Sequence, residues 1–331
     1  MTALFTAFGE NKLMPSNPDC ECVVINGRNG YLRANSSWIL GRLVRDFESW
    51  RGPEIEAKLS QMLQEKRDEL QKKADTNQVV PMPLRAGLCV SVYSASSKRE
   101  AGVPDWDHVY YSGLIVAILQ LAVAAIPFGI YGDWGVLMIT AVGIILAFAT
   151  GSLPQWKREK WACRKKNKIV ILSRGNGSQH AIVIKGHNNA LDLEDIASGQ
   201  KNIDASASLS TRFALTTLAI LWVFLLITAA GVSANTWFLL VVGGIGILQN
   251  LAAAGLTRKP GAFGIHLEFI DVIGHVKVMA TLFEVERKFP HVGLSMLDVF
   301  FNGQRTDGEQ KEWADLAASV EARNAVQSAH S

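Results

Sequence analysis

Residues 110–153 read YYSGLIVAILQLAVAAIPFGIYGDWGVLMITAVGIILAFATGSL. Asp133 is the only charged residue in this stretch, and it falls in the tight turn YGDWG near the midpoint. A helix needs about 20 mostly apolar residues to cross the hydrocarbon core of a bilayer. The stretch therefore predicts two transmembrane helices, Tyr110–Ile130 and Trp134–Leu153, joined as a hairpin.

A second stretch of matching length, Phe213–Leu256, repeats the pattern, with the turn VSANT between Phe213–Gly231 and Trp237–Leu256. One long buried helix in a soluble protein is the alternative for each stretch, but turn residues lie near both midpoints. We therefore expect an α-helical integral membrane protein with four transmembrane helices in two hairpins, residues 109–153 and 213–256.

The hairpins divide the remainder into an N-terminal segment (residues 1–108), a central insert (residues 154–212) and a C-terminal helical tail (residues 257–331). An even number of spans places all three on one side of the membrane. The basic run WKREKWACRKKNK follows the first hairpin, whereas neither hairpin turn contains Lys or Arg. The positive-inside rule then predicts that the three segments and both termini are cytosolic, so the sequons at Asn35 and Asn176 stay unused.

The formal net charge of +3 does not favour a nucleic-acid partner, because no aromatic-interleaved basic stripe accompanies it. The expected partners are the lipid bilayer and proteins that contact the cytosolic segments. Anionic lipids are expected to contact the basic run at Lys157, Arg158, Lys160, Arg164, Lys165 and Lys166. Within this run, Cys163 is a candidate for S-palmitoylation. Cys20 and Cys22 lack the second cysteine pair that would support a zinc site.

The three segments predict a cytosolic α+β region assembled from all of them. CVVINGRNGYLRA predicts a hairpin around residues 26–30, and KIVILSRGNGSQHAIVIKG predicts another around Asn176-Gly177. Helices are expected over Trp38–Trp50 after a cap at Ser36 or Ser37, from Pro53 with Ile55, Leu59, Met62, Leu63 and Leu70 on one face, and after Asp192. From about Val276 a further helix is expected, with Val278, Leu282, Val285 and Phe289 on its apolar face and Lys277, Thr281, Glu284 and Lys288 on its polar face.

Catalytic chemistry has only one visible set of candidates, His266, Glu268, Asp271 and His275. These residue types serve in metal and acid–base sites, but their spacing matches no established motif such as HExxH. The glycine-rich turn at residues 175–177 lacks the Lys-Ser/Thr pair of a phosphate-binding loop. His180 and His187 are expected to hydrogen-bond structurally. The sequence thus predicts no catalytic, cofactor or metal site.

The predicted spans contain no Asp, Glu, Lys, Arg or His, which argues against a pump or coupled transporter. Four polar residues would line the path of a passive channel: Gln120, Thr140, Gln249 and Asn250. The alternative for Gln120, Gln249 and Asn250 is hydrogen bonding between helices. Small residues recur at fourfold spacing, at Gly113 and Ala117 and at Gly143, Ala147 and Gly151. They favour close packing within the bundle, with a homo-oligomer as the alternative.

The segments SLPQWKREKWACRK, VILSRGNGSQHAIVI, LDLEDIA and GLSMLDVFFNGQ resemble uncharacterised multi-span membrane proteins of filamentous fungi. The resemblance extends over most of the chain from about the first span onward and implies a topology without an activity. It also implies an accessory role in a secondary-metabolite pathway, as an alternative. From the residues we expect a non-catalytic scaffold or interaction protein; a membrane-bound pathway enzyme and a passive transporter or channel are the other two hypotheses.

Overall fold

The computed structural model describes residues 13–14, 17–74, 79–199, 207–301 and 303–329 of the chain. The chain divides into two compact units. The membrane unit consists of Met1–Asn17, Val103–Ala162 and Gly199–Gly264. The α/β unit consists of Pro18–Gly102, Cys163–Ser198 and Ile265–Ser331. Each unit is thus assembled from segments that are separated in the sequence.

The membrane unit contains four long apolar helices: α5 (His108–Tyr131), α6 (Gly135–Gly151), α9 (Leu209–Gly231) and α10 (Thr236–Gly255). Among the described residues, α5, α9 and α10 are each long and apolar enough to cross a membrane. A fourth span results if α6 and the short helix α7 (Pro154–Lys160), which meet at a bend of 41°, are counted as one. Three of the four spans expected from the sequence are therefore present as single helices, and the fourth only when α6 and α7 are counted together.

Local sequence explains where these helices begin and turn. The carboxylate of Asp107 caps α5 by accepting a hydrogen bond from the Tyr110 amide at 3.0 Å. The turn after α5 contains Gly132 at φ 69°, a backbone conformation that glycine adopts without steric cost. Ser208 caps α9, so this helix begins at Leu209, earlier than the expected Phe213. The two hairpin turns are joined by a hydrogen bond of 2.9 Å from Asn235 Nδ2 to Asp133 Oδ2.

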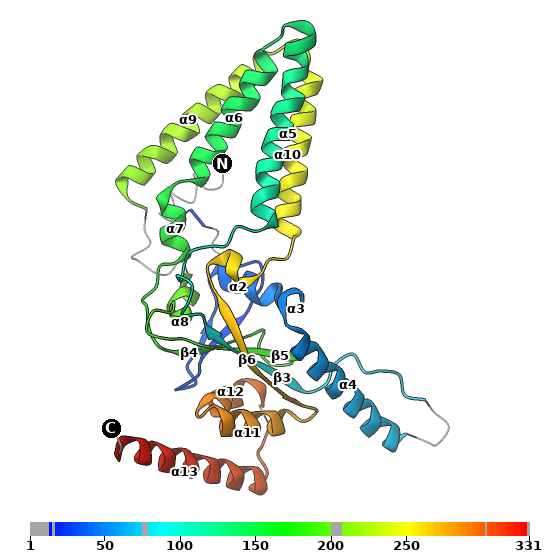
Figure 1. The fold of residues 1–331 in the computed structure, drawn as a ribbon, viewed down its shortest axis with the longest axis vertical. Coiled ribbons are helices and arrows are strands. Elements are labelled where there is room, and N and C mark those ends of the chain that lie inside the picture. The colour runs from blue at the N-terminus through cyan, green and yellow to red at the C-terminus, as the bar shows by residue number, and fades with distance from the viewer. Residues whose placement is uncertain (1–12, 15–16, 75–78, 200–206, 302, 330–331) are drawn as a thin grey trace. The chain divides into compact units, whose positions relative to one another are not determined.

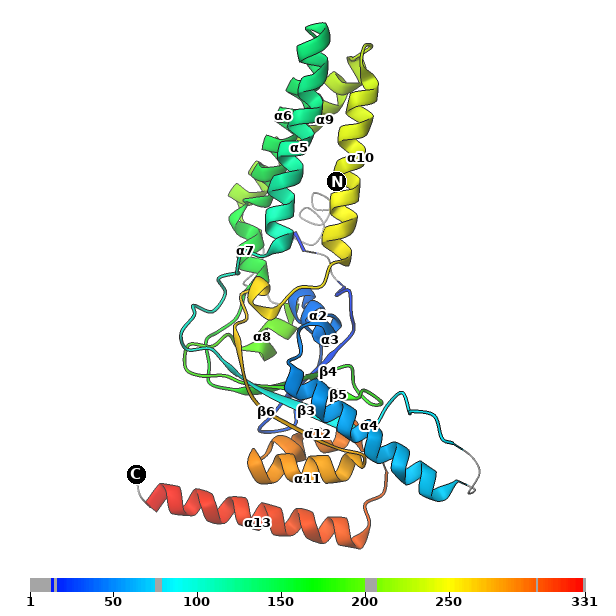
Figure 2. The same ribbon diagram turned by 45° about the vertical axis from the view of Figure 1, so that its right-hand side comes forward.

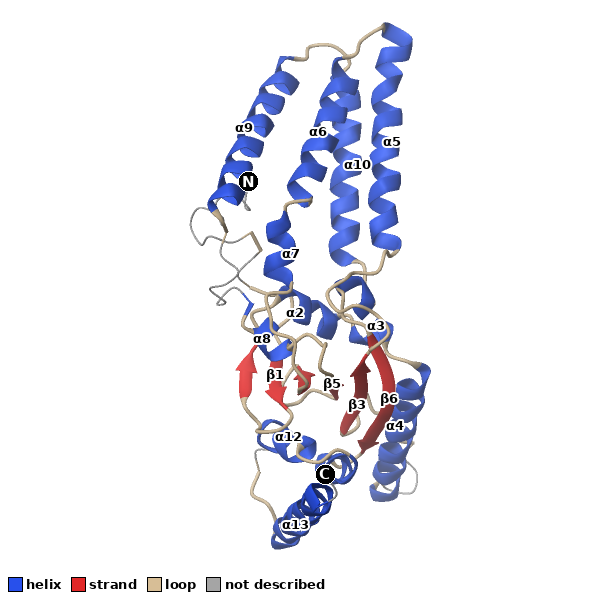
Figure 3. Ribbon diagram, turned by 60° about the vertical axis from the view of Figure 1, so that its left-hand side comes forward, coloured by secondary structure: helices blue, strands red, loops and turns tan. Residues whose placement is uncertain are grey.

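The two helices of the second hairpin do not pack against each other along their length, although a helical hairpin was expected. Helix α5 packs against α6 and α10, while α9 packs mainly against α6, so α9 and α10 diverge from their shared turn (Figures 1 and 3). Two hydrogen bonds explain why α5 packs against α10. Gln120 of α5 donates to the Val242 carbonyl at 3.0 Å, and Gln249 of α10 donates to Ser112 Oγ at 2.9 Å.

Two of the small residues in the spans lie where helices approach closely. A Cβ at Gly143 would meet Leu225 Cδ2 at 3.6 Å, which places this glycine at the contact of α6 with α9. A Cβ at Gly246 would meet Gln120 Nε2 at 3.1 Å, so glycine leaves room for the glutamine amide. Gly151 has no such neighbour within 4 Å. Packing inside the bundle therefore accounts for Gly143 but not for every small residue that recurs at fourfold spacing.

The α/β unit is built on a six-stranded mixed sheet with the order β2-β1-β4-β5-β3-β6. Its strands are β1 (Val23–Asn26), β2 (Leu32–Ala34), β3 (Leu88–Ala95), β4 (Ile169–Ser173), β5 (His180–Lys185) and β6 (Leu267–His275). The β1–β2 and β4–β5 pairs are antiparallel, which confirms both predicted hairpins. Strand β3 runs parallel to β5 and antiparallel to β6. Each of the three soluble segments therefore contributes strands to one sheet.

Helices cover both faces of the sheet (Figures 1 and 2). One face is covered by α11 (Val278–Lys288), α12 (Val292–Phe300) and α13 (Asp307–Ala329). These helices form a hydrophobic core with alternate strand residues such as Leu88, Val90 and Val92. On the other face lie α2 (Trp38–Arg45), α3 (Phe47–Trp50), α4 (Pro53–Lys73) and α8 (Leu193–Ala197). Ring contacts of Phe47 with His180 and of Trp50 with Tyr93 fasten α3 to this face.

The structure corrects several sequence expectations for this unit. The tail over residues 257–331 is not wholly helical, because it supplies strand β6 before α11 begins. Thr281, expected on the polar face of that helix, is fully buried and donates to the Leu88 carbonyl at 3.1 Å. The helix expected over Trp38–Trp50 breaks at Asp46 into α2 and α3. Leu70, expected on the apolar face of α4, is exposed.

Candidate functional site

The four catalytic candidates do not form one site. Glu268, Asp271 and His275 lie along β6, and at about 3.3 Å per residue the first and last are roughly 23 Å apart. Each has a different direct partner: Ser96 Oγ at 2.7 Å for Glu268, Lys288 Nζ at 2.9 Å for Asp271, and Glu284 Oε2 at 2.5 Å for His275. Lys288 Nζ also lies 3.3 Å from Glu284 Oε1, so Asp271 and His275 belong to one chain of ion pairs, whereas Glu268 does not. His266 lies just before β6, and its backbone carbonyl accepts from the Ser96 amide at 2.8 Å.

No cluster suitable for a metal ion is found among the described His, Cys, Asp and Glu side chains. The thiols of Cys22 and Cys89 are buried, and burial raises the pKa of each to about 12. Cys163, the predicted lipidation site, is half-buried, and burial is the main cause that raises its pKa to about 11. These protonated thiols are poor nucleophiles and poor metal ligands at neutral pH.

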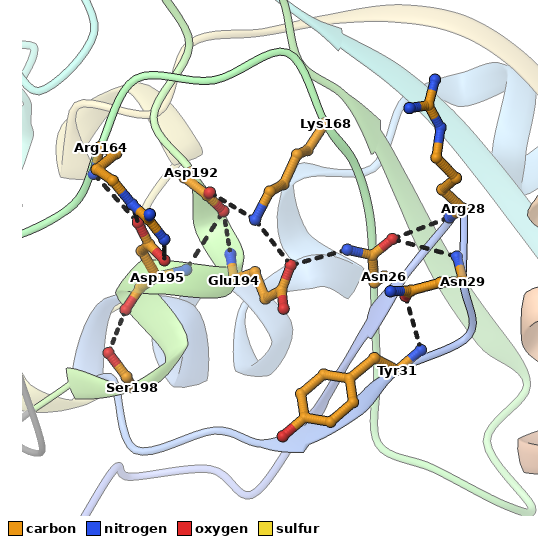
Figure 4. Close-up of polar contacts among 10 residues, drawn as sticks. All are labelled: Asn26, Arg28, Asn29, Tyr31, Arg164, Lys168, Asp192, Glu194, Asp195 and Ser198. Atoms are coloured by element: carbon orange, nitrogen blue, oxygen red, sulfur yellow. Dashed lines mark hydrogen bonds and ion pairs between the residues drawn. The ribbon is translucent and has the colours of Figure 1, made fainter.

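A polar network joins the first strand, the central insert and α8 (Figure 4). The fully buried carboxylate of Asp192 caps α8 through the amides of Glu194 and Asp195, as the sequence predicted. Lys168 Nζ lies 2.7 Å from Asp192 Oδ2 and 3.0 Å from Glu194 Oε2. Burial alone would raise the pKa of Glu194, but hydrogen bonds from Lys168 and Asn26 hold it below its usual value.

Some members of the basic run predicted to contact anionic lipids are partly buried or paired within the protein. Arg164 forms two charge-assisted hydrogen bonds with Asp195, of 2.7 and 2.8 Å (Figure 4). The side chain of Lys160 is partly buried, with its ammonium 6.0 Å from the centre of the Trp161 ring. The remaining four members of the predicted set are exposed: Lys157, Arg158, Lys165 and Lys166. Charge available for a partner is thus concentrated in these four.

The polar residues of the spans are placed individually rather than along a path. Gln120 and Gln249 make the two contacts between α5 and α10 described above. Thr140 is buried and donates to the Val136 carbonyl of its own helix at 2.9 Å. Asn250 is exposed on α10. The interhelical role weighed for these residues from the sequence accounts for the two glutamines.

A cavity of about 260 Å³ lies beside the β4–β5 turn of the α/β unit. Its walls come from α2 and α3, from Arg85 before β3, and from the turn itself. The lining residues are Val44, Phe47, Glu48, Arg85, Leu172, Ser173, Arg174, Asn176, Gly177, Ser178, Gln179, His180 and Ile182. We name this the β4–β5 turn cavity. It brings together polar groups from three separate stretches of sequence.

The two histidines of the central insert differ. His187 hydrogen-bonds structurally as expected, with Nε2 3.0 Å from the Ser96 carbonyl and Nδ1 accepting from the Asn189 amide at 3.2 Å. His180 lines the β4–β5 turn cavity, and its buried Nδ1 has no hydrogen-bond partner within the described part of the chain. Burial lowers the pKa of His180 to about 4, so its ring is neutral at pH 7.

Sequence reasoning did not identify this cavity. The sequence shows the turn to be glycine-rich, and Gly175 and Gly177 adopt positive φ angles of 91° and 79°. The residues that complete the cavity lie far earlier in the chain, the nearest of them being Arg85, so no local spacing indicates them. Comparison of the chain with models of protein families, with curated proteins and with solved structures finds no match.

Proposed function

We propose that this is a membrane-anchored, non-catalytic interaction protein, in which apolar helices provide the anchor and the α/β unit provides the recognition surface. The observation that carries this proposal is that Glu268, Asp271 and His275 are spread along β6 and engaged by neighbours within the unit, with Asp271 and His275 linked only through Lys288 and Glu284. General acid–base or metal chemistry requires such groups to converge on one reacting atom. Without that convergence, binding is the simpler role for the unit.

The proposed arrangement places the α/β unit and both termini on the cytosolic side. The basic run after the first hairpin and the lack of Lys and Arg in both hairpin turns support it. The test is glycosylation mapping in sealed microsomes, with an extended acceptor loop inserted after Ser233 in the second turn. We expect this loop to be glycosylated and native Asn176 to stay unmodified; modification of Asn176 would reverse the proposed orientation.

The edge of the sheet at β2 offers an exposed apolar surface for a protein partner. Leu32 of β2 is opposite Ile25 in the register, so both lie on the face that α12 covers. Yet Leu32 stays 49% exposed, and Leu294 of α12 stays 47% exposed. An edge strand also carries backbone groups that no neighbouring strand pairs. The edge at Leu32 is therefore our choice for the recognition surface, and Leu294 is a second exposed apolar position on the helix that covers this face.

Site-specific photo-crosslinking in living cells tests this choice. A photoreactive residue at position 32 or 294 should give discrete heavier adducts, whereas the exposed position Glu69 on α4 is the control. Adducts from position 69 alone would place recognition elsewhere on the unit.

Metabolite profiling distinguishes the proposed binding role from the enzyme hypothesis. The combined Glu268→Gln, Asp271→Asn and His275→Gln variant should leave the profile unchanged. An accumulating precursor would replace the proposed function with catalysis.

A further inference from the structure

The β4–β5 turn cavity contains positive charge that the protein itself does not neutralise. Arg85 and Arg174 line the cavity, and neither guanidinium has an ion-pair or hydrogen-bond partner among the residues the structure describes. Several other basic side chains of the α/β unit do have close acidic partners: Arg42 with Asp19 at 2.6 Å, Arg164 with Asp195, and Lys288 with Asp271. The two arginines without such partners line the same cavity.

The acidic content of the cavity is smaller than its basic content. Glu48 is the single carboxylate among the lining residues, against the two guanidiniums. His180 adds no positive charge at neutral pH, because burial keeps its ring unprotonated. The cavity thus has an excess of positive charge and, in the histidine ring, an uncharged hydrogen-bonding group. This combination suits an anion better than a cation or a neutral molecule.

The unpartnered Nδ1 of His180 is an independent sign of an unfilled hydrogen-bonding position. A buried polar atom without a partner costs about 1 to 3 kcal/mol, and native proteins contain few of them. The neighbouring hydroxyls do not hydrogen-bond to Nδ1, since Ser173 Oγ and Ser178 Oγ both donate to the His180 carbonyl at 3.0 Å. Because His180 Nδ1 has almost no accessible surface, a ligand supplies its partner only after the side chains around it shift.

The remaining walls are apolar. Val44 and Phe47 approach from α2 and α3, and Leu172 and Ile182 come from β4 and β5. The volume of about 260 Å³ corresponds to roughly nine water molecules at ~30 Å³ each, which suits a small organic molecule rather than a polymer. Arginine binds carboxylate and phosphate groups with paired hydrogen bonds, and the apolar walls would cover the body of such a molecule.

We propose that the β4–β5 turn cavity binds a small organic anion, with its carboxylate or phosphate group held by Arg85 and Arg174 and its apolar body against Val44 and Phe47. The role is binding rather than turnover, because Ser178 and Ser173 hydrogen-bond to the His180 backbone instead of its ring, so no activated nucleophile is present in the cavity. The site is independent of the proposed recognition surface at β2 and would remain if that proposal failed.

Isothermal titration calorimetry on the full chain in neutral detergent tests the site with four probes: phenyl phosphate, phenylacetate, inorganic phosphate and the neutral benzyl alcohol. At least one aromatic anion should bind with a dissociation constant below about 1 mM and at least tenfold more tightly than benzyl alcohol and inorganic phosphate. No binding of either aromatic anion up to about 10 mM, or equal binding of benzyl alcohol, would overturn the proposal.

Variants connect the binding to the named residues. Arg85→Gln and Arg174→Gln should each weaken anion binding by about fivefold to twentyfold, and Val44→Trp should abolish it by filling the cavity. Arg28→Gln, which changes an exposed arginine in the β1–β2 turn, is the matched control and should bind normally. Because Arg85 and Arg174 are exposed, their variants are expected to fold, and thermal unfolding confirms this for each sample. Unchanged affinity in both variants would contradict the assignment.

A free metabolite and a lipid headgroup can offer the same anionic group. Phosphatidic acid added to the micelles should displace bound phenyl phosphate if the natural ligand is a lipid headgroup. Failure to displace it would assign the site to a soluble anion. Both outcomes keep the site and identify the source of its ligand.

Discussion

Asn26 Nδ2 donates a hydrogen bond of 2.8 Å to Glu194 Oε2, although 168 residues separate the two in the chain. Asn26 ends β1 in the N-terminal segment, and Glu194 lies in α8 of the central insert. Lys168 joins the same carboxylate at 3.0 Å (Figure 4). The contact therefore fastens two segments that the first membrane hairpin separates, and it does so with charged groups that are partly shielded from water.

Replacing Lys168 with Met should destabilise the α/β unit. The side chain of Asp192 is 0% exposed, so the variant leaves a buried carboxylate without its cation. Removing one partner of a buried ion pair costs about 3 to 5 kcal/mol, and the partial exposure of Lys168 places the expected loss near the lower end. Denaturant unfolding in detergent measures it. Lys165→Met, at an exposed neighbour, is the control; equal losses in both variants would refute this reading.

Arg258 and Asp107 should stabilise the membrane unit through an ion pair that can be separated from helix capping. Their side chains meet at 2.5 and 2.9 Å, and Asp107 also caps α5. Asp107→Asn keeps the cap and loses the ion pair, at an expected cost of about 1 kcal/mol; Asp107→Ala loses both, at about 2 kcal/mol. Thermal unfolding in detergent ranks the variants. The double variant Asp107→Asn with Arg258→Gln should cost little more than Asp107→Asn alone.

The pKa of His180 predicts an acid-sensitive α/β unit. Burial, assisted by the positive charges of Arg51 and Arg174 and opposed by Glu48, lowers this pKa from 6.5 to about 4. The unfolded chain then binds more protons between these values, so stability from the neutral ring is complete above pH 6.5 and is lost as the pH falls toward 4. The loss is at most about 3 kcal/mol. Hydrogen exchange of β5 amides against pH measures it, and His180→Gln should flatten the profile.

Thiol labelling should follow burial. The pKa of Cys163, raised from 9.0 to about 11, lowers its thiolate fraction about 100-fold at neutral pH relative to an ordinary cysteine. We expect maleimide to modify Cys163 correspondingly slowly, and Cys22 and Cys89 only after unfolding. Mass spectrometry of peptides after timed labelling gives each rate. Rapid modification of Cys163 in the folded protein would show that its thiol is more accessible than the structure indicates, and would favour lipidation.

The sequence predicts those features that depend on neighbouring residues. The apolar helices follow from run length, the two β-hairpins from their Asn-Gly turns, and the cap of α8 from Asp192. Each of these requires only a few consecutive residues. The helices expected after Pro53 and near Val276 were likewise predicted, because their buried residues recur at helical spacing.

Features that depend on distant partners could not be predicted in this way. Strand β3 pairs with β5 and β6, far along the chain, and nothing in its own sequence identifies them. The divergence of α9 from α10 depends on hydrogen bonds between α5 and α10, which the hairpin pattern does not show. The β4–β5 turn cavity likewise needs Phe47 and Arg85 beside the turn. Such contacts become visible only when the sheet is assembled.

The position of β3 between β5 and β6 also sets an order of events during synthesis. A ribosome makes β3 before either neighbour: β5 follows the first membrane hairpin, and β6 follows the second. The first six of its eight residues are buried in the finished sheet, so the nascent chain carries an unpaired apolar strand while both apolar hairpins are being synthesised. The sheet of the α/β unit is therefore completed only after the second hairpin has been made, and until then β3 is exposed for recognition by chaperones.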